Sequence, residues 1–458
     1  MSLKIKLDTL SEVERIKIAK DLTFDKNDGK KSSFQMMKMQ SAPEKKEVYA
    51  FDVEDSLGGD ILSIPFNYGA THLKIARRDM DDCVKMSDDC RFTAKLRDYQ
   101  KEPVKEVVSY LNRVGSSCFS CYVGFGKTVC AIYIAAKTHV KTLIVVNRLV
   151  LLDQWEEEIR SFCKDVRVCK LVPAKIKDDK IPDADFYICN AINLSKFDLS
   201  DISFCIVDEL HLIITEVLSQ GLRRCNPRFL LGLSATPYRT DGLDGLIDAY
   251  FGKDKIIKEL DRKHTVYRIN TGFAPDFEIA KTGNIDWNSL LNSQCYNPYR
   301  NRWICEIVKH HSDRVFILMV KRVEQGRMLC KILEEMGIGY DSLLGKERYT
   351  DSDRRVLVAT GSKASVGFSC KKLNTMVLCS DMGADFYVQA IGRIMRKQDG
   401  PEPLFFDLVD NHPSLKRHWA QRSKVYKKHG GEVSDFFKKY GKDFFSCQIK
   451  NVEKGEVC

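Results

Sequence analysis

From residue 91 onward, short and continuously apolar runs alternate with segments of helical periodicity. The first runs are CFSCYV, TLIVV, DFYIC, SFCIV and FLLGL, and the helical segments TVCAIYIAAKT and LVLLDQWEEEIRSF fit between them. Strands that are apolar on both faces are typical of a parallel sheet covered by helices on both sides. The pattern weakens over roughly residues 253–300 and resumes with VFILM, RVLVAT, TMVLC and PLFFDLV. The sequence therefore predicts an α/β protein with two parallel-sheet units, whose ligands lie at the carboxyl ends of the strands.

The length of 458 residues agrees with this division, because about 150 residues per domain gives about three folding units. We predict an N-terminal accessory domain over residues 1–90 and a first α/β domain over residues 91–255. A less regular connection follows over residues 256–298. The second α/β domain, with a basic C-terminal extension, is predicted over residues 299–458.

Composition excludes several other classes of protein. With 44% hydrophobic and 30% charged residues, the chain is neither disordered nor collagen-like. No apolar run approaches the roughly 18 residues of a membrane span, and the charged N-terminus is unlike a signal peptide. The 17 cysteines lie mostly within apolar runs, which indicates reduced, buried thiols. We expect a soluble intracellular protein without a membrane partner, and structural rather than metal-binding roles for the closely spaced Cys118 and Cys121.

Positive charge is concentrated near the end of the chain. The net charge is +10, and residues 411–458 contribute 11 Lys/Arg minus 5 Asp/Glu, which is +6. This bias is compatible with a polyanionic partner but does not identify one. In DFFKKYGKDFF (435–445), aromatic residues alternate with lysines, a pattern that could stack on bases. We expect instead that the aromatic side chains pack on the second domain, because their spacing is helical.

A phosphate-binding loop is predicted after the first apolar run. CFSCYV leads directly into Gly124-Phe125-Gly126-Lys127-Thr128 and then into a helix. Glycines allow the backbone to wrap around a phosphate, with N–H groups and a helix N-terminus directed at the anion. Lys127 would bind the β- and γ-phosphates, and the Thr128 hydroxyl would bind Mg²⁺. The full GxxxxGK[ST] pattern fails at its first position, which Cys121 occupies.

A pair of carboxylates follows the apolar run SFCIV. Asp208-Glu209-Leu210-His211 begins where this strand is expected to end. Asp208 would hold the metal and Glu209 would polarise an attacking water molecule. A polar cap beside a strand is the structural alternative, but the upstream glycine-lysine-threonine sequence favours the catalytic interpretation.

Two further segments contribute candidate residues. The run FLLGL ends at Ser234-Ala235-Thr236-Pro237, and QAIGRIMR spans residues 389–396. Arg393 and Arg396 are three residues apart, so they share one face of a helix. They could form a surface pair, or they could act on charge that develops at the γ-phosphate.

Taken in order, these segments resemble the motif series of superfamily-2 helicases. The matching segments are LRDYQ (96–100), GFGKT (124–128), DELH (208–211), SAT (234–236), VATGSKASVGF (358–368) and QAIGRIMR (389–396). SATPYRTDGL and TLIVVNRLVLLDQW are similar to the XPB and UvsW types. DLTF, VYAFDV, IPFNYG and RNRWICEIV resemble the transcript-release helicases of poxviruses and other large DNA viruses.

The resemblance implies two tandem RecA-like domains that bind ATP with Mg²⁺ and move along nucleic acid. It further implies DNA in preference to RNA, 3′-to-5′ movement, and a role in viral transcription or in DNA repair and recombination. The residues that would bind the nucleotide are Gln100, which would contact adenine, with Val123, Gly124, Phe125, Gly126, Lys127 and Thr128. The catalytic residues would be Lys127, Asp208, Glu209, Gln389, Arg393 and Arg396. His211, Ser234 and Thr236 would couple hydrolysis to movement, and Asn147, Arg148, Thr360 and Gly367 would contact the strand.

Three alternatives remain at this point. The protein could be a translocase that moves on duplex DNA without separating its strands, or an RNA helicase. A non-catalytic scaffold is disfavoured, because the lysine, threonine, carboxylates and arginines of an ATP site are all present. One departure from the XPB pattern is Arg239-Thr240-Asp241, where threonine replaces the glutamate of an Arg-Glu-Asp triplet.

Overall fold

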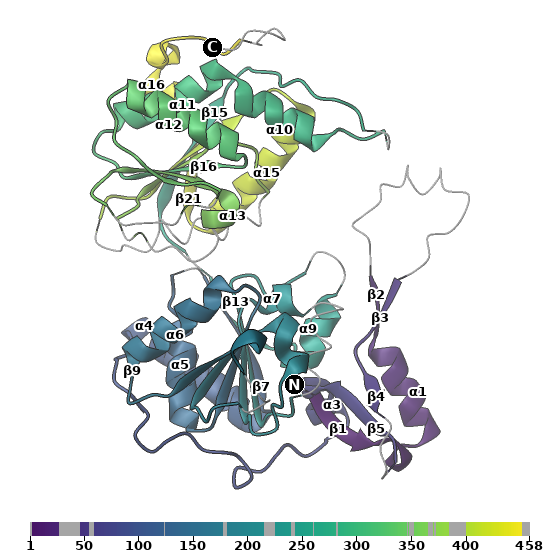
Figure 1. Cartoon of the computed structure of the whole chain (residues 1–458). Coiled ribbons are helices and arrows are strands. Elements are labelled where there is room, and N and C mark those ends of the chain that lie inside the picture. The colour runs from purple at the N-terminus through teal and green to yellow at the C-terminus, as the bar shows by residue number, and fades with distance from the viewer. Residues whose placement is uncertain are drawn as a thin grey trace. The chain divides into compact units, whose positions relative to one another are not determined.

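The computed structural model divides into two compact units, each of which is described separately. The first contains Met1–Cys121 and Phe125–Lys258, and the second contains Tyr122–Gly124 and Glu259–Cys458 (Figure 1). The structure describes residues 2–26, 46–54, 59–122, 124–176, 181–214, 225–239, 243–259, 261–280, 283–345, 347, 352–364, 370, 372–383 and 400–450.

A parallel sheet forms the centre of the first unit. Among the described residues its strands, in spatial order, are β10 (Val168–Leu171), β11 (Phe186–Asn190), β8 (Thr142–Val146), β12 (Phe204–Val207), β13 (Phe229–Ser234), β7 (Ser116–Cys121) and β14 (Lys255–Lys258). Every neighbouring pair is parallel. Val207 pairs with Val145, and Ser234 pairs with Ser120, so the carboxyl ends of the central strands meet at one edge.

Helices cover both faces of this sheet. They are α4 (Asp98–Arg113), α5 (Lys127–Thr138) and α6 (Val150–Phe162) on one face, and α7 (Leu210–Ile213) and α9 (Asp244–Phe251) on the other (Figure 1). A short ladder, β6 (Arg91–Phe92) with β9 (Cys163–Lys164), lies beside α5 and α6. Helix α6 is strongly amphipathic and buries Leu152, Trp155 and Ile159, as expected of a helix that packs on a sheet.

The N-terminal segment packs on the α9 side of the first unit. Its elements are β1 (Ser2–Lys6), α1 (Glu12–Asp21), β2 (Thr23–Lys26), β3 (Lys46–Tyr49), β4 (Asp52–Glu54), β5 (Ile61–Pro65) and α3 (Phe66–His72). Leu3, Ile64 and Phe66 share one hydrophobic core with Leu246 and Tyr250 of α9. By these contacts, residues 1–90 lie within the first compact unit, and the predicted limits of the accessory domain stay a prediction.

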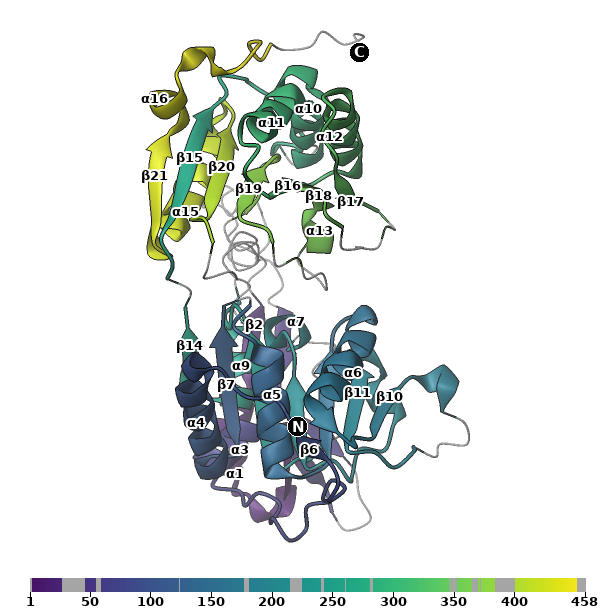
Figure 2. The same ribbon diagram turned by 90° about the vertical axis from the view of Figure 1, so that its left-hand side faces the viewer.

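The second unit also contains a parallel sheet. Among its described residues the strands, in spatial order, are β17 (Asp341–Leu343), β18 (Val356–Thr360), β16 (Phe316–Val320), β19 (Thr375–Leu378), β20 (Leu404–Val409), β15 (His264–Asn270) and β21 (Gly431–Asp435) (Figure 2). The helices are α10 (Trp287–Tyr296), α11 (Pro298–His310), α12 (Val323–Glu335), α13 (Gly361–Ala364), α15 (Pro413–Lys428) and α16 (Phe436–Tyr440). The two sheets confirm the predicted α/β class.

The segment predicted to be a less regular connection, residues 256–298, contains a strand and a helix among its described residues, and the predicted domain limits stay a prediction. Residues 264–270 form β15, which pairs with both β20 and β21, and residues 287–296 form α10. Strand β15 was missed because its sequence, HTVYRIN, interrupts its apolar positions with polar ones.

The expected packing of the C-terminal aromatic residues and the expected burial of the cysteines are confirmed. Phe436 is fully buried, and the rings of Phe445 and Trp303 stack with their centroids 3.9 Å apart, so this segment packs on the second unit. In the described part of the chain no disulfide joins two cysteines and most of their side chains are buried, and burial raises the pKa of Cys118 to about 12. Within the same residues, no helix combines the length and apolarity needed to cross a membrane.

Candidate nucleotide site

The phosphate loop joins the end of β7 to the start of α5. Gly124 and Gly126 have φ values of 93° and 94°, in the left-handed region that glycine adopts without a steric cost. Gly126 is the N-cap of α5, so the first N–H groups of that helix point into the loop. The Lys127 ammonium donates a hydrogen bond to the Cys121 carbonyl, 2.9 Å away. Backbone donors and an ammonium group in this arrangement suit an anionic phosphate chain.

Gln100 braces this loop from α4. Its Nε2 donates to the Phe125 carbonyl at 2.7 Å, and its Oε1 accepts from the Arg97 backbone N–H at 2.9 Å. The side chain is only 3% exposed. A Cβ atom at Gly126 would lie 2.5 Å from Gln100 Nε2, so the loop and the amide fit closely. The hydrogen bonds assign Gln100 a structural contact with the loop, and the predicted contact with adenine stays a prediction.

Replacing Gln100 with glutamate separates these two roles. The carboxylate can still accept from Arg97, but it places an oxygen against the Phe125 carbonyl, where an N–H donor is required. The loss of a buried hydrogen bond costs about 1–3 kcal/mol, so we expect nucleotide affinity to fall roughly 10-fold. If Gln100 acts through the loop, affinities for ATP and GTP fall equally in equilibrium binding. A selective loss of ATP affinity would instead establish an adenine contact.

Asp208 and Glu209 lie at the carboxyl end of β12. The Asp208 N–H donates to the Val145 carbonyl, and its carboxylate accepts from the Glu209 N–H at 3.0 Å. Trp155 Nε1 donates to Asp208 Oδ2 at 2.9 Å. Burial, reinforced by the charge of Glu209, raises the pKa of Asp208, while the hydrogen bond from Trp155 and the charge of Lys127 oppose this shift. A carboxylate binds a metal in its ionised form, so a bound cation would favour the ionised form of Asp208.

Glu209 has an unusual backbone conformation and an unsatisfied carboxylate oxygen. Its φ of 47° lies in the left-handed region, a strained conformation that is common at functional sites. Its Oε2 is buried without a hydrogen-bond partner among the described residues and lies 3.6 Å from His211 Nδ1. An unpaired buried acceptor is costly, and a water molecule at this point would satisfy it. These features fit a general base that activates water.

His211 connects the carboxylate segment to β13. Its Nδ1 lies 2.9 Å from Ser234 Oγ, and Ser234 Oγ accepts a hydrogen bond from the Thr236 N–H at 3.0 Å. Burial, together with the charges of Arg239 and Lys127, lowers the pKa of His211 to about 4. His211 is therefore neutral at pH 7, and the Ser234 hydroxyl can donate a hydrogen bond to Nδ1. The predicted coupling residues thus form one hydrogen-bonded chain in the structure.

Candidate nucleic-acid contacts occupy different environments. Asn147 and Arg148 follow β8 at the same edge of the first sheet, where Arg148 is exposed and Asn147 half-buried. Thr360 ends β18 in the second unit and is only 6% exposed, with its hydroxyl 3.5 Å from Ser362 Oγ. The predicted residues Val123, Gly367, Gln389, Arg393 and Arg396 lie outside the described residues, and their roles stay predictions.

Two residues of the site were not predicted. Trp155 contacts Asp208 from α6, and Arg239 donates to the carbonyls of His211 and Ile214 at 2.5 and 3.0 Å. In the sequence, Arg239 belongs to an altered triplet and Trp155 to a segment of helical periodicity. Their partners are distant in sequence, so no local pattern indicates these contacts.

The site fits ATP with Mg²⁺. Among the described residues, no group of three His, Cys, Asp or Glu side chains is placed to hold a metal ion. Mg²⁺ does not require such a group, because it is usually bound by one or two protein oxygens together with substrate phosphates and water. Asp208 and the half-buried Thr128 at the start of α5 would supply those protein oxygens.

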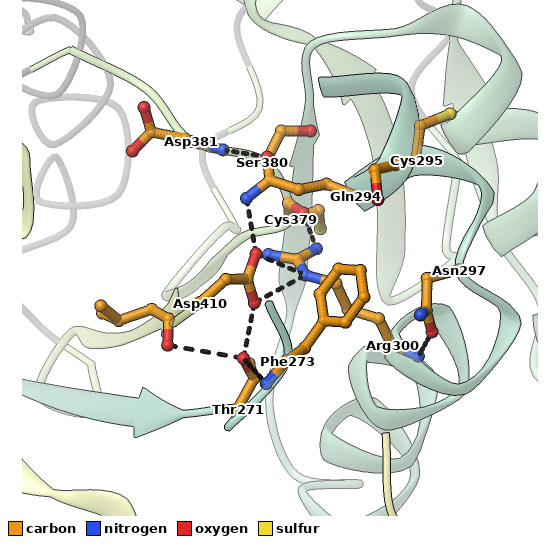
Figure 3. Close-up of polar contacts among 12 residues, drawn as sticks. Thr271, Phe273, Gln294, Cys295, Asn297, Arg300, Cys379, Ser380, Asp381 and Asp410 are labelled. Carbon is orange, nitrogen blue, oxygen red and sulfur yellow. Dashed lines mark hydrogen bonds and ion pairs between the residues drawn. The ribbon is translucent and has the colours of Figure 1, made fainter. Parts of the chain in front are cut away.

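In the second unit, a buried polar network holds together the carboxyl ends of three strands. Arg300 of α11 and Asp410, just after β20, are both fully buried, and Arg300 Nε lies 3.1 Å from Asp410 Oδ2 (Figure 3). Asp410 also accepts from Thr271 Oγ1 at 2.6 Å and from Gln294 Nε2 at 2.5 Å. Arg300 additionally donates to the carbonyl of Cys379, which follows β19. The network fixes the edge of the sheet at which a ligand is expected.

A parallel α/β fold with a glycine-rich phosphate loop and a carboxylate pair at the strand ends defines a nucleotide hydrolase of the RecA-like class. Residues 93–239 match the family "Type III restriction enzyme, res subunit". The chain is 40% identical over 373 residues to "Putative helicase 161L" of Invertebrate iridescent virus 6, a match that covers 76% of this chain and 84% of that protein. The chain therefore belongs to the superfamily-2 helicases, within a group found in large DNA viruses, and it is an ATP-hydrolysing enzyme.

More distant matches agree on the fold. The chain is 23% identical over 369 residues to "DNA 3'-5' translocase XPB2" of Sulfurisphaera tokodaii, covering 69% of this chain and 81% of that one. The structure of S. cerevisiae Dbp5 bound to RNA and ADP BeF3 superposes with a TM-score of 0.53 at 14% identity, over 75% of this chain and 90% of that chain. The similarity to Dbp5 supports the tandem RecA-like architecture.

Proposed function

We propose that this protein uses ATP hydrolysis to move 3′-to-5′ along DNA and to separate its strands. The observation that carries the proposal is the arrangement at one edge of the first sheet. There the phosphate loop and the Asp208–Glu209 pair lie at the same edge as the exposed Arg148. The Sulfurisphaera relative is named a DNA 3'-5' translocase, which supports both DNA and the polarity.

The residues of the first unit would divide the hydrolysis between them. Lys127 would bind the phosphates, and Asp208 and Thr128 would hold Mg²⁺, which when bound offsets negative charge on the phosphates. Glu209 would orient and deprotonate the attacking water. The hydrogen-bonded residues His211, Ser234 and Thr236 would transmit a conformational change that accompanies hydrolysis from the end of β12 to the end of β13.

The nature of the nucleic acid is tested by stimulation of ATPase activity with single-stranded DNA, duplex DNA, forks and RNA. We expect DNA to stimulate, and partial duplexes with a single 3′ overhang to be unwound. Stimulation by RNA alone would identify RNA and not DNA as the substrate. Unwinding only from a 5′ overhang would show 5′-to-3′ movement and contradict the proposed polarity. Stimulation by duplex DNA without unwinding would identify a translocase that leaves strands paired.

Arg148 provides a test of the nucleic-acid contact. Its exposed guanidinium would bind a phosphate, a contact that carries no sequence information. We expect Arg148→Ala to weaken DNA binding equally across sequences and to reduce the slope of log K against log salt by about one. Fluorescence anisotropy at several salt concentrations measures both quantities. Arg113→Ala, an exposed arginine at the end of α4, is the matched control and should leave both unchanged.

A further inference from the structure

The indole of Trp155 makes a direct contact with the candidate metal ligand. Trp155 is 3% exposed, and its Nε1 donates to Asp208 Oδ2 at 2.9 Å, across 53 positions of the sequence. The other carboxylate oxygen, Oδ1, accepts from the Glu209 N–H. Both oxygens of Asp208 are therefore held by donors, which fixes the rotation of the carboxylate.

An indole N–H is suited to this role because it is a donor only. The indole nitrogen offers no lone pair to a metal, so it does not compete with Asp208 as a metal ligand. Each carboxylate oxygen has more than one lone pair, so the hydrogen bond leaves acceptor capacity that can face the ion. Partners of this kind orient metal ligands, and their removal typically costs about 10–100-fold in metal affinity.

Helix α6 holds the indole rigidly and begins beside the candidate nucleic-acid loop. Leu152 and Ile159 bury the helix against the sheet, and Lys170 pairs with Asp153 at 2.8 Å. Leu149, immediately before α6, is 66% exposed. Leu149 precedes Trp155 by six positions, which is about 9 Å along a helix. A shift of this loop therefore reaches the indole through about one and a half turns of anchored helix.

We infer that Trp155 is a positioning residue that orients Asp208 toward Mg²⁺ and links the loop at Asn147–Leu149 to that metal ligand. This inference rests on the proposed function, in which Asp208 binds the metal and the loop binds DNA. It identifies a residue of α6, outside the phosphate loop and the carboxylate segment, on which the nucleotide site depends.

The test uses the full chain and the fluorescent nucleotide N-methylanthraniloyl-ADP, titrated with and without Mg²⁺. Trp155→Phe keeps an aromatic ring but removes the N–H donor. We expect the Mg²⁺-dependent gain in nucleotide affinity to fall roughly 10-fold or more, with the affinity in EDTA unchanged. Trp303→Phe is the matched control, since Trp303 is a buried indole that donates to the Cys447 carbonyl at 2.7 Å in the second unit.

The link to the loop is measured in the same titration with a single-stranded oligodeoxynucleotide added. In the wild-type protein we expect the oligonucleotide to change the gain in nucleotide affinity that Mg²⁺ produces. In Trp155→Phe we expect the oligonucleotide to have no such effect. The inference is overturned if Trp155→Phe keeps the full Mg²⁺-dependent gain in nucleotide affinity, or if the oligonucleotide still changes that gain in this variant. A wild-type protein that gains nothing from Mg²⁺ contradicts the proposed ATP site instead, so the two failures are distinguishable.

A second measurement needs no change at Trp155. The chain contains four tryptophans, so ¹⁵N-tryptophan labelling gives four indole signals. Trp287→Phe, Trp303→Phe and Trp419→Phe assign the Trp155 signal by elimination. We expect this signal to move with Mg²⁺ concentration at constant ADP in the wild-type protein, and a stationary signal overturns the inference.

Discussion

Replacing Glu209 with glutamine is expected to slow ATP turnover by about 10²–10⁴-fold while nucleotide affinity stays at the wild-type level. The amide keeps the size of the side chain but cannot take a proton from water. Glu209 Oε2 is buried without a hydrogen-bond partner among the described residues, so its loss as an acceptor breaks no hydrogen bond within that part of the chain. Steady-state ATPase assays together with equilibrium nucleotide binding measure the two quantities.

Two comparisons make the result specific to the general base. Lys127→Ala removes the ammonium group that would bind phosphates, so it should weaken nucleotide binding itself. Glu102→Gln, an exposed glutamate on α4, should leave turnover and binding unchanged. If Glu209→Gln hydrolyses ATP at the wild-type rate, another group must activate the water.

The phosphate loop could be predicted from sequence because its determinants are local. Gly124 and Gly126 mark the backbone conformation, and the preceding apolar run marks the strand that positions it. The same holds for Asp208 and Glu209, which directly follow a buried strand. Where the residues that define a strand end and the polar residues of the motif lie within a few positions of each other, the sequence is sufficient to locate the motif.

Contacts between distant residues could not be predicted in the same way. In the sequence, Trp155 is one of the apolar positions of an amphipathic helix. Only the fold brings its N–H to Asp208. The hydrogen bond from the Gln100 amide to the Phe125 carbonyl was likewise not predicted, and the contact of Gln100 with adenine stays a prediction. The sequence of β15 likewise lacks the continuous apolar run of its neighbours, so its place in the sheet follows only from tertiary pairing.

The largest effect on stability is expected from the Arg300–Asp410 pair, whose members lie 110 positions apart in the sequence. Both side chains are fully buried, and Thr271 and Gln294 donate to the same carboxylate. Asp410→Asn removes the negative charge with little change in shape and leaves the Arg300 guanidinium without a counter-charge. Breaking a buried pair by removing one partner costs about 3–5 kcal/mol in the free energy of unfolding.

Urea unfolding of the full chain, followed by tryptophan fluorescence, measures this loss. Trp287, Trp303 and Trp419 lie in the second unit, so the signal reports chiefly on the part that contains the pair. Glu259→Gln is the matched control, because it removes an exposed pair with Lys428 whose side chains are 49% and 60% exposed. Exposed pairs contribute about 0–1 kcal/mol, so this variant should unfold close to the wild-type midpoint.

The double variant Arg300→Met/Asp410→Leu distinguishes an unpaired charge from lost packing. If the cost of Asp410→Asn comes from leaving Arg300 charged and unpaired, removing both charges should recover part of the lost stability. If the double variant is less stable than Asp410→Asn by the full cost of a second substitution, the two side chains contribute independently. Equal unfolding midpoints for Asp410→Asn and Glu259→Gln would contradict the expected importance of the buried pair, because the two pairs differ mainly in their exposure to water.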